Sequence, residues 1–260
     1  MQKDMLIELK AEKVLNSLKE GKRLDERKLD EYRKIKIEKD LYHNAEGSAI
    51  VNLGKTRIAA GVKILLGAPY PDSPAEGTIS VGTELIPLAS PFFETGPPTP
   101  NAIELARVVD RGLRESKAVD FKKLCVIEGE KVFVCFIDIY AINYDGNLFD
   151  ACSIGALSAL NNAKLPKVED GELVKGEHSG KLKLERKPLL STFAKIGNSL
   201  VLDPSLVEEA AMTARFSVAT TEDNFLSAFQ KGLSGSIDKN DVDNAIDTAL
   251  KASKEIRKLI

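Results

Sequence analysis

The sequence predicts a fold that mixes helices and strands, of the α/β or α+β class. The first observation is that segments with helix-like and strand-like hydrophobic patterns alternate along the chain. The second is size, because 260 residues, 43% of them hydrophobic, can bury a large core without disulfides. The third is a weak internal similarity between residues 50–58 and 193–201, each of which is predicted to form a strand, a glycine turn and a second strand. Two related lobes would explain this similarity most simply.

The N-terminal part of the chain is predicted to form one helix and then a series of strands. Leucine and valine residues between positions 6 and 18 recur at near-helical spacing, and Gly21 ends the pattern, so we expect an amphipathic helix over residues 4–20. A stretch of mixed charge follows over residues 22–39. Strands are expected over 33–41, 48–53, 56–65 and 78–88, with a hairpin turn at Gly54-Lys55 and loops at 67–77 and 91–100.

Two helices and a further set of strands are predicted for the rest of the chain. Asn101 is suited to cap a helix over residues 101–118. Residues 148–164 are apolar on almost every face, which indicates a buried helix. The other expected elements are strands over 121–127 and 131–143, a turn at 144–147, a linker over 166–180, four or five short strands within 181–220, and a helix over about 238–258.

Composition and charge exclude several classes of protein. With 37 basic and 39 acidic side chains the net charge is −2, which excludes a generally basic nucleic-acid coat but leaves room for a local basic site. The longest apolar run, residues 132–137, is far shorter than the roughly 20 residues that a membrane span needs. The N-terminal segment is charged and does not contain the apolar core of a secretory signal peptide. We therefore expect a cytoplasmic protein without membrane contact.

Cysteine and histidine are too few and too scattered for the common metal sites. Cys125, Cys135 and Cys152 form no C-x-x-C pair, so we interpret them as reduced structural thiols. His43 and His178 lie in turn-like sequences and are interpreted as surface residues. Neither a metal ion nor a cofactor is expected.

The helix predicted over residues 101–118 carries the pattern that points to a ligand. On a helical wheel, Arg107, Arg111 and Arg114 fall within a stripe of about 60°, opposite the apolar face. One interpretation is a solvated face with alternating charges. The other is a phosphate-binding stripe, because planar guanidinium groups bind phosphate oxygens with two hydrogen bonds at once. An RNA backbone is then the natural partner.

Two other patterns contain residue types that occur in chemical sites. Gly54-Lys55-Thr56 lacks the earlier glycine of a nucleotide-binding loop and joins two predicted strands, so it is a hairpin turn. Asp203, Glu208 and Glu209 follow a predicted strand. Such a cluster is more often a solvated turn or helix start than a metal or acid–base site.

Four groups of motifs follow one another along the chain. They are Arg23-Leu-Asp-Glu-Arg-Lys with Arg33-Lys-Ile, Gly47-Ser-Ala with Leu53-Gly-Lys-Thr, Glu104-Leu-Ala-Arg107 with Arg111-Gly-Leu-Arg114, and Asp145-Gly-Asn-Leu-Phe-Asp-Ala151. In order and spacing the sequence resembles the RNase PH family over almost the whole chain, from about residue 20 to residue 255, and the last motif is similar to that of the non-catalytic ring subunit of the archaeal exosome. The resemblance implies an α+β fold with an N-terminal helix (1–22) and two related β-α halves of the ribosomal-protein-S5-domain-2-like type (23–165 and 166–260), packed as one compact unit.

The resemblance also implies what this chain lacks. Active members of the family use orthophosphate to release nucleoside diphosphates from the 3′ end of RNA, and a Gly-Gly-(Thr/Ser)-Arg loop holds the phosphate. The equivalent stretch here is residues 146–149, where Leu148 offers no hydroxyl and Phe149 no charge. Asp203 matches the family, whereas Glu209 is one methylene longer and Arg215 replaces a usual aspartate. No catalytic residue is therefore expected.

The partners that the resemblance implies are RNA and other exosome subunits. Arg107 and Arg111 match family positions that contact RNA phosphates, and Arg114 is a third candidate. The expected partners are single-stranded RNA, the catalytic RNase-PH-like subunit in an alternating hexameric ring, and cap subunits with S1, KH or zinc-ribbon domains. Two alternatives stay open: a phosphorolytic 3′-to-5′ exoribonuclease active on its own, and a purely structural interaction module without RNA contact.

Overall fold

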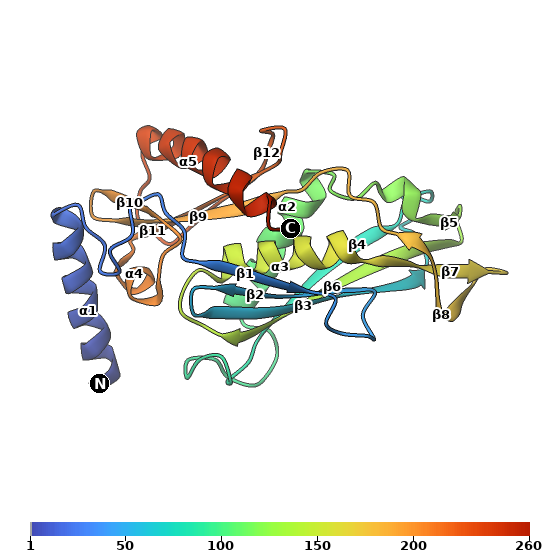
Figure 1. The fold of residues 1–260 in the computed structure, drawn as a ribbon, viewed down its shortest axis with the longest axis horizontal. Helices are drawn as coiled ribbons and strands as arrows, with labels where there is room; N and C mark the ends of the chain where they lie inside the picture. The colour runs from blue at the N-terminus through green and yellow to red at the C-terminus, as the bar shows by residue number, and fades with distance from the viewer. Residues whose placement is uncertain (1) are drawn as a thin grey trace.

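The larger sheet forms the first half of the molecule (Figure 1). The computed structural model describes residues 2–260 and, in the N-terminal helix, the side chains from residue 10 onward. Five strands follow the order β1-β2-β3-β6-β4, and a short strand, β5, also pairs with β6. Only β4 runs parallel to its neighbour. The strands are β1 (Ile35–Lys39), β2 (Gly47–Leu53), β3 (Thr56–Gly67), β4 (Thr78–Leu85), β5 (Cys125–Ile127) and β6 (Lys131–Asn143).

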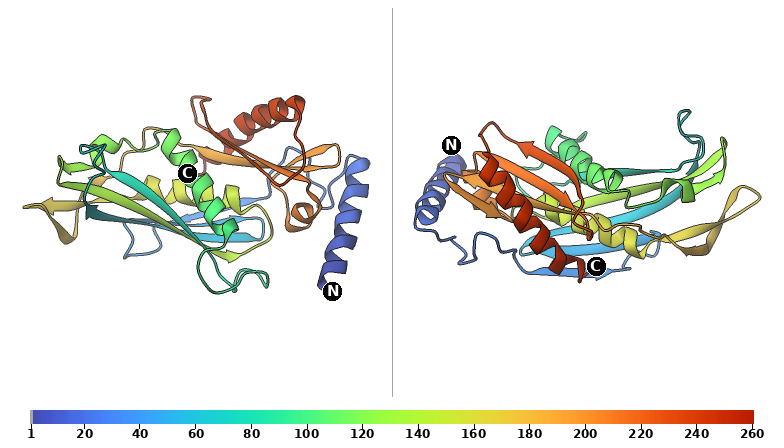
Figure 2. Two further views of the ribbon diagram at one scale, coloured as in Figure 1. Left: turned by 180° about the vertical axis from the view of Figure 1, so that it is seen from behind. Right: turned by 90° about the horizontal axis from the view of Figure 1, so that it is seen from above.

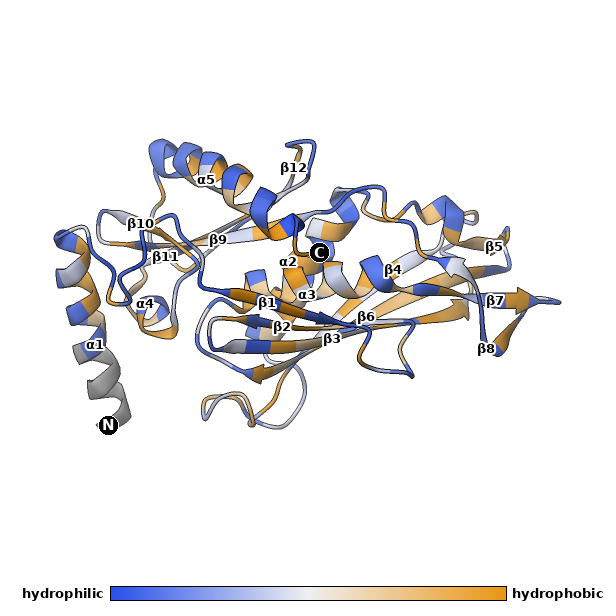
Figure 3. Ribbon diagram, viewed as in Figure 1, coloured by the Kyte–Doolittle hydropathy of each residue, from blue (hydrophilic) through white to orange (hydrophobic). Residues whose placement is uncertain are grey.

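Two helices cover one face of this sheet. Helix α2 (Pro100–Glu115) packs beside β4, and α3 (Leu148–Asn162) packs across β2 and β3. Helix α3 also contacts the second sheet, so every residue from Leu148 to Leu160 is buried, as the apolar sequence predicts. A Cβ atom on Gly155 would lie 2.3 Å from the side chain of Ile58, so only glycine allows α3 to approach β3 this closely. Figure 3 shows the hydrophobic residues gathered on α3 and the strands beside it.

The second half is a four-stranded sheet covered by a C-terminal helix (Figure 2). The strands follow the antiparallel order β10-β9-β11-β12. Helix α5 (Lys239–Arg257) packs Ala245 and Ala249 against β9 and β11. Val14 and Leu18 of α1 (Gln2–Lys19) pack on this same half rather than on the first. The remaining elements here are β9 (Leu189–Ile196), β10 (Ser199–Leu202), α4 (Leu206–Ala211), β11 (Ala214–Thr220) and β12 (Leu226–Gly232).

The predicted fold class is confirmed, with two sheet-and-helix halves and an N-terminal helix. The predicted linker over 166–180 is wrong, because β7 (Lys164–Glu169) and β8 (Glu172–Lys181) form a hairpin that projects from the body (Figure 1). His178 accordingly lies in β8 and not in a turn, although it is exposed as expected. The predicted boundary after residue 165 falls within β7, and the division into halves stays a prediction.

Smaller differences concern short elements and the cysteines. The strand predicted over 121–127 begins as a 3-10 turn, η1 (Phe121–Leu124), and the short helix α4 and strand β12 were not predicted. Cys135 and Cys152 are buried free thiols, as expected, whereas Cys125 is only half-buried. Burial raises the pKa of Cys135 to about 12, so this thiol is protonated. Among the described helices, none has the length and apolar character to cross a bilayer.

Candidate nucleic-acid interface

Helix α2 presents two of the three predicted arginines to solvent. The helix begins one residue before the predicted start, and its N-cap is Thr99, whose hydroxyl accepts a hydrogen bond from the amide of Ala102 at 3.3 Å. Arg107 and Arg111 are exposed. Neither guanidinium has a hydrogen-bond or ion-pair partner within the part of the chain whose side chains are described. Their charge is therefore available to an anionic ligand.

Arg114 differs from these two because its donors are used inside the protein. Its guanidinium forms two hydrogen bonds of 3.1 Å with Asp110, one helical turn earlier. It also donates to the carbonyl of Ile79 at 2.7 Å and lies 5.7 Å from the ring centroid of Phe121. Arg114 thus joins α2 to β4 and η1. The sequence places the three arginines on one face, but the structure brings only Arg107 and Arg111 together as free cations.

The loop before α3 is closed by internal hydrogen bonds. Gly146 adopts φ +88°, and a Cβ atom there would lie 2.5 Å from the backbone of Leu206, so the loop lies directly on the segment that begins α4. Asn147, with φ +52°, caps α3 and donates its backbone N–H to Glu209 at 2.8 Å. The hydroxyl of Thr56 donates to the Gly146 carbonyl at 2.6 Å. These backbone groups are consequently bound within the protein.

Leu148 and Phe149 line a cavity of about 580 Å³ between α2, α3 and α4. Both side chains are more than nine-tenths buried in the first turn of α3. The hydroxyl of Tyr144 donates to the carboxylate of Glu209 at the same cavity. Burial raises the pKa of Glu209, and burial beside that carboxylate raises the pKa of Tyr144. The cavity is thus mainly apolar, and the Glu209 carboxylate at it is already hydrogen-bonded.

Arg215 of β11 enters this cavity and pairs with α2. Its Nη2 lies 2.5 Å from Oε1 of Glu104, and its guanidinium lies 4.0 Å from the ring centroid of Phe149. Gln230 of β12 donates to the same Glu104 oxygen at 3.1 Å. A Cβ atom at position 232, opposite, would lie 2.6 Å from Nη2 of Arg215, so a larger residue than Gly232 would displace this guanidinium. Sequence reasoning named Arg215 but did not find its partner, which is 111 residues earlier in the chain.

Asp203 is the centre of a buried polar cluster that joins the halves. Its side chain has no exposed surface, and Arg33 donates to both of its oxygens, at 2.9 and 2.8 Å. Arg27 donates to Oδ2 at 3.1 Å, and Asn147 donates to Oδ1 at 2.7 Å. This carboxylate is thus neutralised by two guanidinium groups from the N-terminal segment. Within the described residues no group of three metal-binding side chains occurs.

Arg23 forms a second ion pair beside this cluster. Its guanidinium bonds to both oxygens of Glu208, at 2.8 and 2.7 Å, and both side chains are buried. Arg23 also donates to the carbonyls of Leu202 and Asp203, at 2.9 Å each. The sequence shows only a dense run of charged residues over 22–39. Nothing near Arg23, Arg27 or Arg33 in the sequence indicates that their side chains point into the protein. Asp203 and Glu208 are therefore buried and ion-paired, so the predicted solvated turn is wrong, whereas the other expectation, a helix start, fits Glu208 and Glu209 in the first turn of α4.

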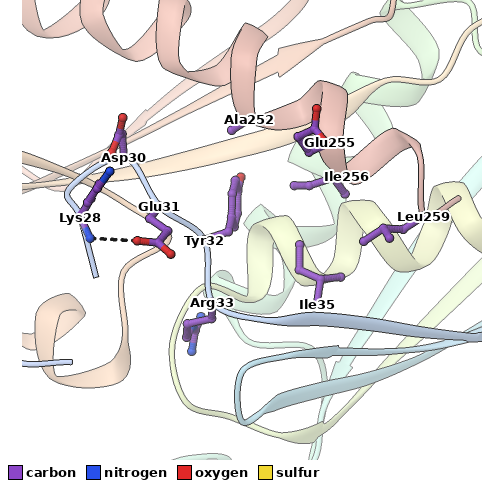
Figure 4. A pocket seen from close by; sticks show the side chains of 10 residues that line it. All are labelled: Lys28, Asp30, Glu31, Tyr32, Arg33, Ile35, Ala252, Glu255, Ile256 and Leu259. Carbon is purple, nitrogen blue, oxygen red and sulfur yellow. Dashed lines mark hydrogen bonds between the residues drawn. The ribbon is translucent and has the colours of Figure 1, made fainter. Parts of the chain in front are cut away.

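A second cavity, of about 610 Å³, lies between residues 28–35 and the C-terminal turn of α5 (Figure 4). Its apolar lining includes Ile35, Ile256 and Leu259, and Glu31 is one of its polar lining residues. Tyr32 also lines it and donates its hydroxyl proton to Asp150 at 2.7 Å. No residue of α2 lines this cavity, so it is separate from the exposed arginines.

The family of the chain follows from comparison with family models. The model of the 3′ exoribonuclease family, domain 1 (RNase PH), matches residues 31–166, and the model of domain 2 matches residues 188–252. These ranges cover most of the chain. The chain belongs to the RNase PH family of 3′ exoribonucleases. The resemblance recognised in the sequence is thereby confirmed.

Relatives and solved structures of this RNase PH family chain carry exosome names. It is 48% identical to the exosome complex component Rrp42 of Thermococcus gammatolerans, over 96% of this chain and 93% of the relative. It is 49% identical to that of Pyrococcus horikoshii, over 95% and 92%. A chain of the Archaeoglobus fulgidus exosome with RNA bound to the active site matches with a TM-score of 0.91, 41% identity and 98% coverage of both chains. A chain of an archaeal exosome core matches with a TM-score of 0.89, 39% identity and coverage of 99% and 98%.

Proposed function

We propose that this chain is a non-catalytic subunit of an archaeal exosome ring that holds RNA while a catalytic paralogue degrades it from the 3′ end with orthophosphate. Support comes from relatives named as exosome components, which match nearly the whole chain. Further support comes from the likeness to a chain of an exosome that contains RNA. The location that follows from this role is the cytoplasm.

The observation that carries the non-catalytic part of the proposal is the closed loop at Gly146 and Asn147. A phosphate nucleophile beside anionic RNA needs free donors and cations to offset the repulsion between them. Here the Asn147 amide is bound by Glu209, and the next two side chains are the buried Leu148 and Phe149. The nearby Arg215 is paired with Glu104 and stacked on Phe149. An orthophosphate ion would find few free donors at this position.

The RNA-holding part of the proposal rests on Arg107 and Arg111. Both are exposed, and they lie one helical turn apart on one face of α2. Each can donate two parallel hydrogen bonds to a phosphate. We assign direct RNA contact to these two residues. Arg114 supports them by fixing α2 to β4, since its donors already bind Asp110 and Ile79.

The proposed partners are other exosome subunits. The catalytic RNase-PH-like subunit would alternate with this chain in a hexameric ring, so that the exposed arginines face RNA held in the neighbour's site. Cap subunits with S1, KH or zinc-ribbon domains would bind one face of the ring. Co-expression with the catalytic RNase-PH-like subunit of the same organism, followed by affinity purification and mass measurement of the intact assembly, tests the ring.

Catalysis is tested by RNA decay in orthophosphate buffer. We expect no nucleoside diphosphate from the purified chain alone, and processive release from the ring with its catalytic partner. The chain would be an enzyme in its own right if it released nucleoside diphosphate alone and if the rate stayed proportional to the amount of chain at every purification step.

RNA contact is tested in the same assembly with a double substitution, Arg107→Ala with Arg111→Ala. Loss of two phosphate contacts is expected to reduce the slope of log affinity against log salt by about one to two and to weaken binding at least tenfold at low salt. The matched control is Lys251→Ala with Lys254→Ala, which removes two exposed cations from α5. Equal RNA binding by both double variants would favour a purely structural module.

A further inference from the structure

We propose that Arg215 is a positioning residue for RNA binding, which acts by keeping the carboxylate of Glu104 away from Arg107. This inference rests on the proposed RNA contact of α2. Glu104 lies one helical turn before Arg107 and two turns before Arg111, on the same side of the helix. An acidic residue three positions before a basic one on a helix is close enough to pair with it.

The structure shows Glu104 held elsewhere. Its Oε1 accepts from Nη2 of Arg215 at 2.5 Å and from Nε2 of Gln230 at 3.1 Å. Both donors belong to the second sheet, Arg215 to β11 and Gln230 to β12. The Glu104 side chain is one-third exposed and the Arg215 side chain about one-tenth exposed, so the carboxylate lies at the border between the cavity and solvent.

The geometry indicates that the charge of Arg215 is placed for Glu104. Its Cζ lies over the Phe149 ring, 4.0 Å from the ring centroid, so the ring supports the guanidinium beside Glu104. Its Nε is buried and finds no acceptor among the described residues. The only carboxylate that it contacts within 4 Å in that part of the chain is Glu104. An arginine that served only to stabilise the fold would be expected to use more of its five N–H donors in hydrogen bonds.

Loss of the Arg215 charge would therefore release a competitor for RNA. With only the neutral donor Gln230 left, the Glu104 carboxylate can rotate toward Arg107 and neutralise it. The effect on RNA would then arise from Glu104 and not from damage to the fold. A second substitution that removes the charge of Glu104 should restore RNA binding even though it cannot restore the ion pair.

The experiment compares four forms of the chain in the assembled ring: wild type, Arg215→Met, Glu104→Gln and the two together. Binding of a fluorescent single-stranded oligoadenylate is followed by anisotropy over a series of salt concentrations. Arg215→Met is expected to weaken binding about five- to tenfold, within the net value of one typical hydrogen bond, and to lower the salt slope by about one. The double variant should return to within about twofold of wild type.

Lys195→Met is the matched control. Lys195 forms a similarly shielded ion pair with Asp241, at 2.7 Å, which joins β9 to α5 and involves neither Glu104 nor the arginines of α2. It is expected to lower the melting temperature without changing RNA affinity. If Arg215→Met prevents assembly, Arg215→Gln with and without Glu104→Gln gives the same comparison.

Two results would overturn the inference: unchanged affinity in Arg215→Met, or a double variant that binds as weakly as Arg215→Met. Arg107→Ala, measured in parallel, separates this from failure of the proposed function. If Arg107→Ala leaves RNA binding unchanged, the RNA contact itself is wrong. If it weakens binding while the Arg215 variants behave as wild type, only the role of Arg215 is wrong.

Discussion

Tyr32 donates a hydrogen bond of 2.7 Å to the carboxylate of Asp150, which has no exposed surface. The contact joins the N-terminal segment to the first turn of α3. The same Asp150 oxygen, Oδ2, also accepts from the backbone of Thr192 at 3.0 Å and from Asn147 at 2.8 Å. Three segments that are distant in sequence thus meet at one carboxyl group.

The first prediction is a pH dependence of stability caused by Asp150. Burial raises the pKa of this carboxyl to about 6, despite the three donors, which act in the opposite direction. A raised pKa in the folded state means that the protonated form is favoured by folding. The contribution of Asp150 to the free energy of unfolding is therefore largest below about pH 4. It decreases as the pH rises through 6, by about 3 kcal/mol in total.

Asp150→Asn isolates this effect because an amide oxygen can accept the same three hydrogen bonds without ionising. The free energies of unfolding of the two proteins, measured with urea from pH 4 to pH 8, should diverge in favour of the variant as the pH rises. A constant difference across this range would contradict the prediction.

The second prediction concerns the buried pair of Arg23 and Glu208. Arg23→Met removes the directly bonded cation of Glu208, whose residue is only 2% exposed, and leaves only Arg27 nearby, 3.9 Å away. We therefore expect a loss of about 3 kcal/mol in the free energy of unfolding. The control Lys36→Met removes an exposed pair with Glu38 and should produce no measurable change. Equal effects of the two substitutions in urea unfolding would show that the buried pair is not a major source of stability.

The third prediction tests the close approach at Gly146. Gly146→Ala introduces a methyl group 2.5 Å from backbone atoms at a positive φ, and it should cost at least about 3 kcal/mol. Gly129 has a similar φ of +76°, yet nothing lies within 4 Å of its added Cβ. Gly129→Ala should therefore cost only about 1 kcal/mol. Thermal unfolding of both variants measures the difference, and similar costs would mean that the loop can move away.

The fourth prediction separates the roles of the arginines on α2. Arg114→Met removes the bonds to Asp110 and Ile79 and should lower the free energy of unfolding by about 1 kcal/mol or more. Arg107→Met has no such bonds to lose and should leave stability unchanged while weakening RNA binding. Calorimetry and anisotropy on the same preparations measure both quantities. The reverse assignment of effects would show that Arg114 is the RNA contact.

Local patterns were sufficient for most of the fold. Helix α2 is predictable because its apolar and charged residues recur at helical spacing, and α3 because it is apolar on all sides. The β7–β8 hairpin was missed because most of β8 is exposed, so glycine, lysine and glutamate occupy its positions instead of alternating apolar residues. Strand exposure of this kind removes the signal on which sequence reasoning depends.

The candidate site was predictable only where its residues share one element. Helix geometry alone places Arg107, Arg111 and Arg114 on one face of α2, and RNA contact by any of them stays a prediction. The partners of Arg23 and Arg33 are about 170 to 185 residues away, and nothing near these arginines distinguishes them from solvated charges. The pairing of Arg215 with Glu104 likewise exists only after the two sheets have packed together.

The cluster at Asp203 has a consequence for how the molecule unfolds. Its carboxylate belongs to the C-terminal half, whereas Arg27, Arg33 and Asn147, which neutralise or bind it, all come from before residue 165. In a polypeptide consisting of residues 166–260 alone, the Asp203 carboxylate would have no cation to pair with. It would either stay buried without a partner, which is costly, or become exposed to water by local unfolding of the residues around it. Cleaving the chain between the halves should therefore give fragments that acquire order only when mixed, and the intact protein should melt in a single cooperative transition.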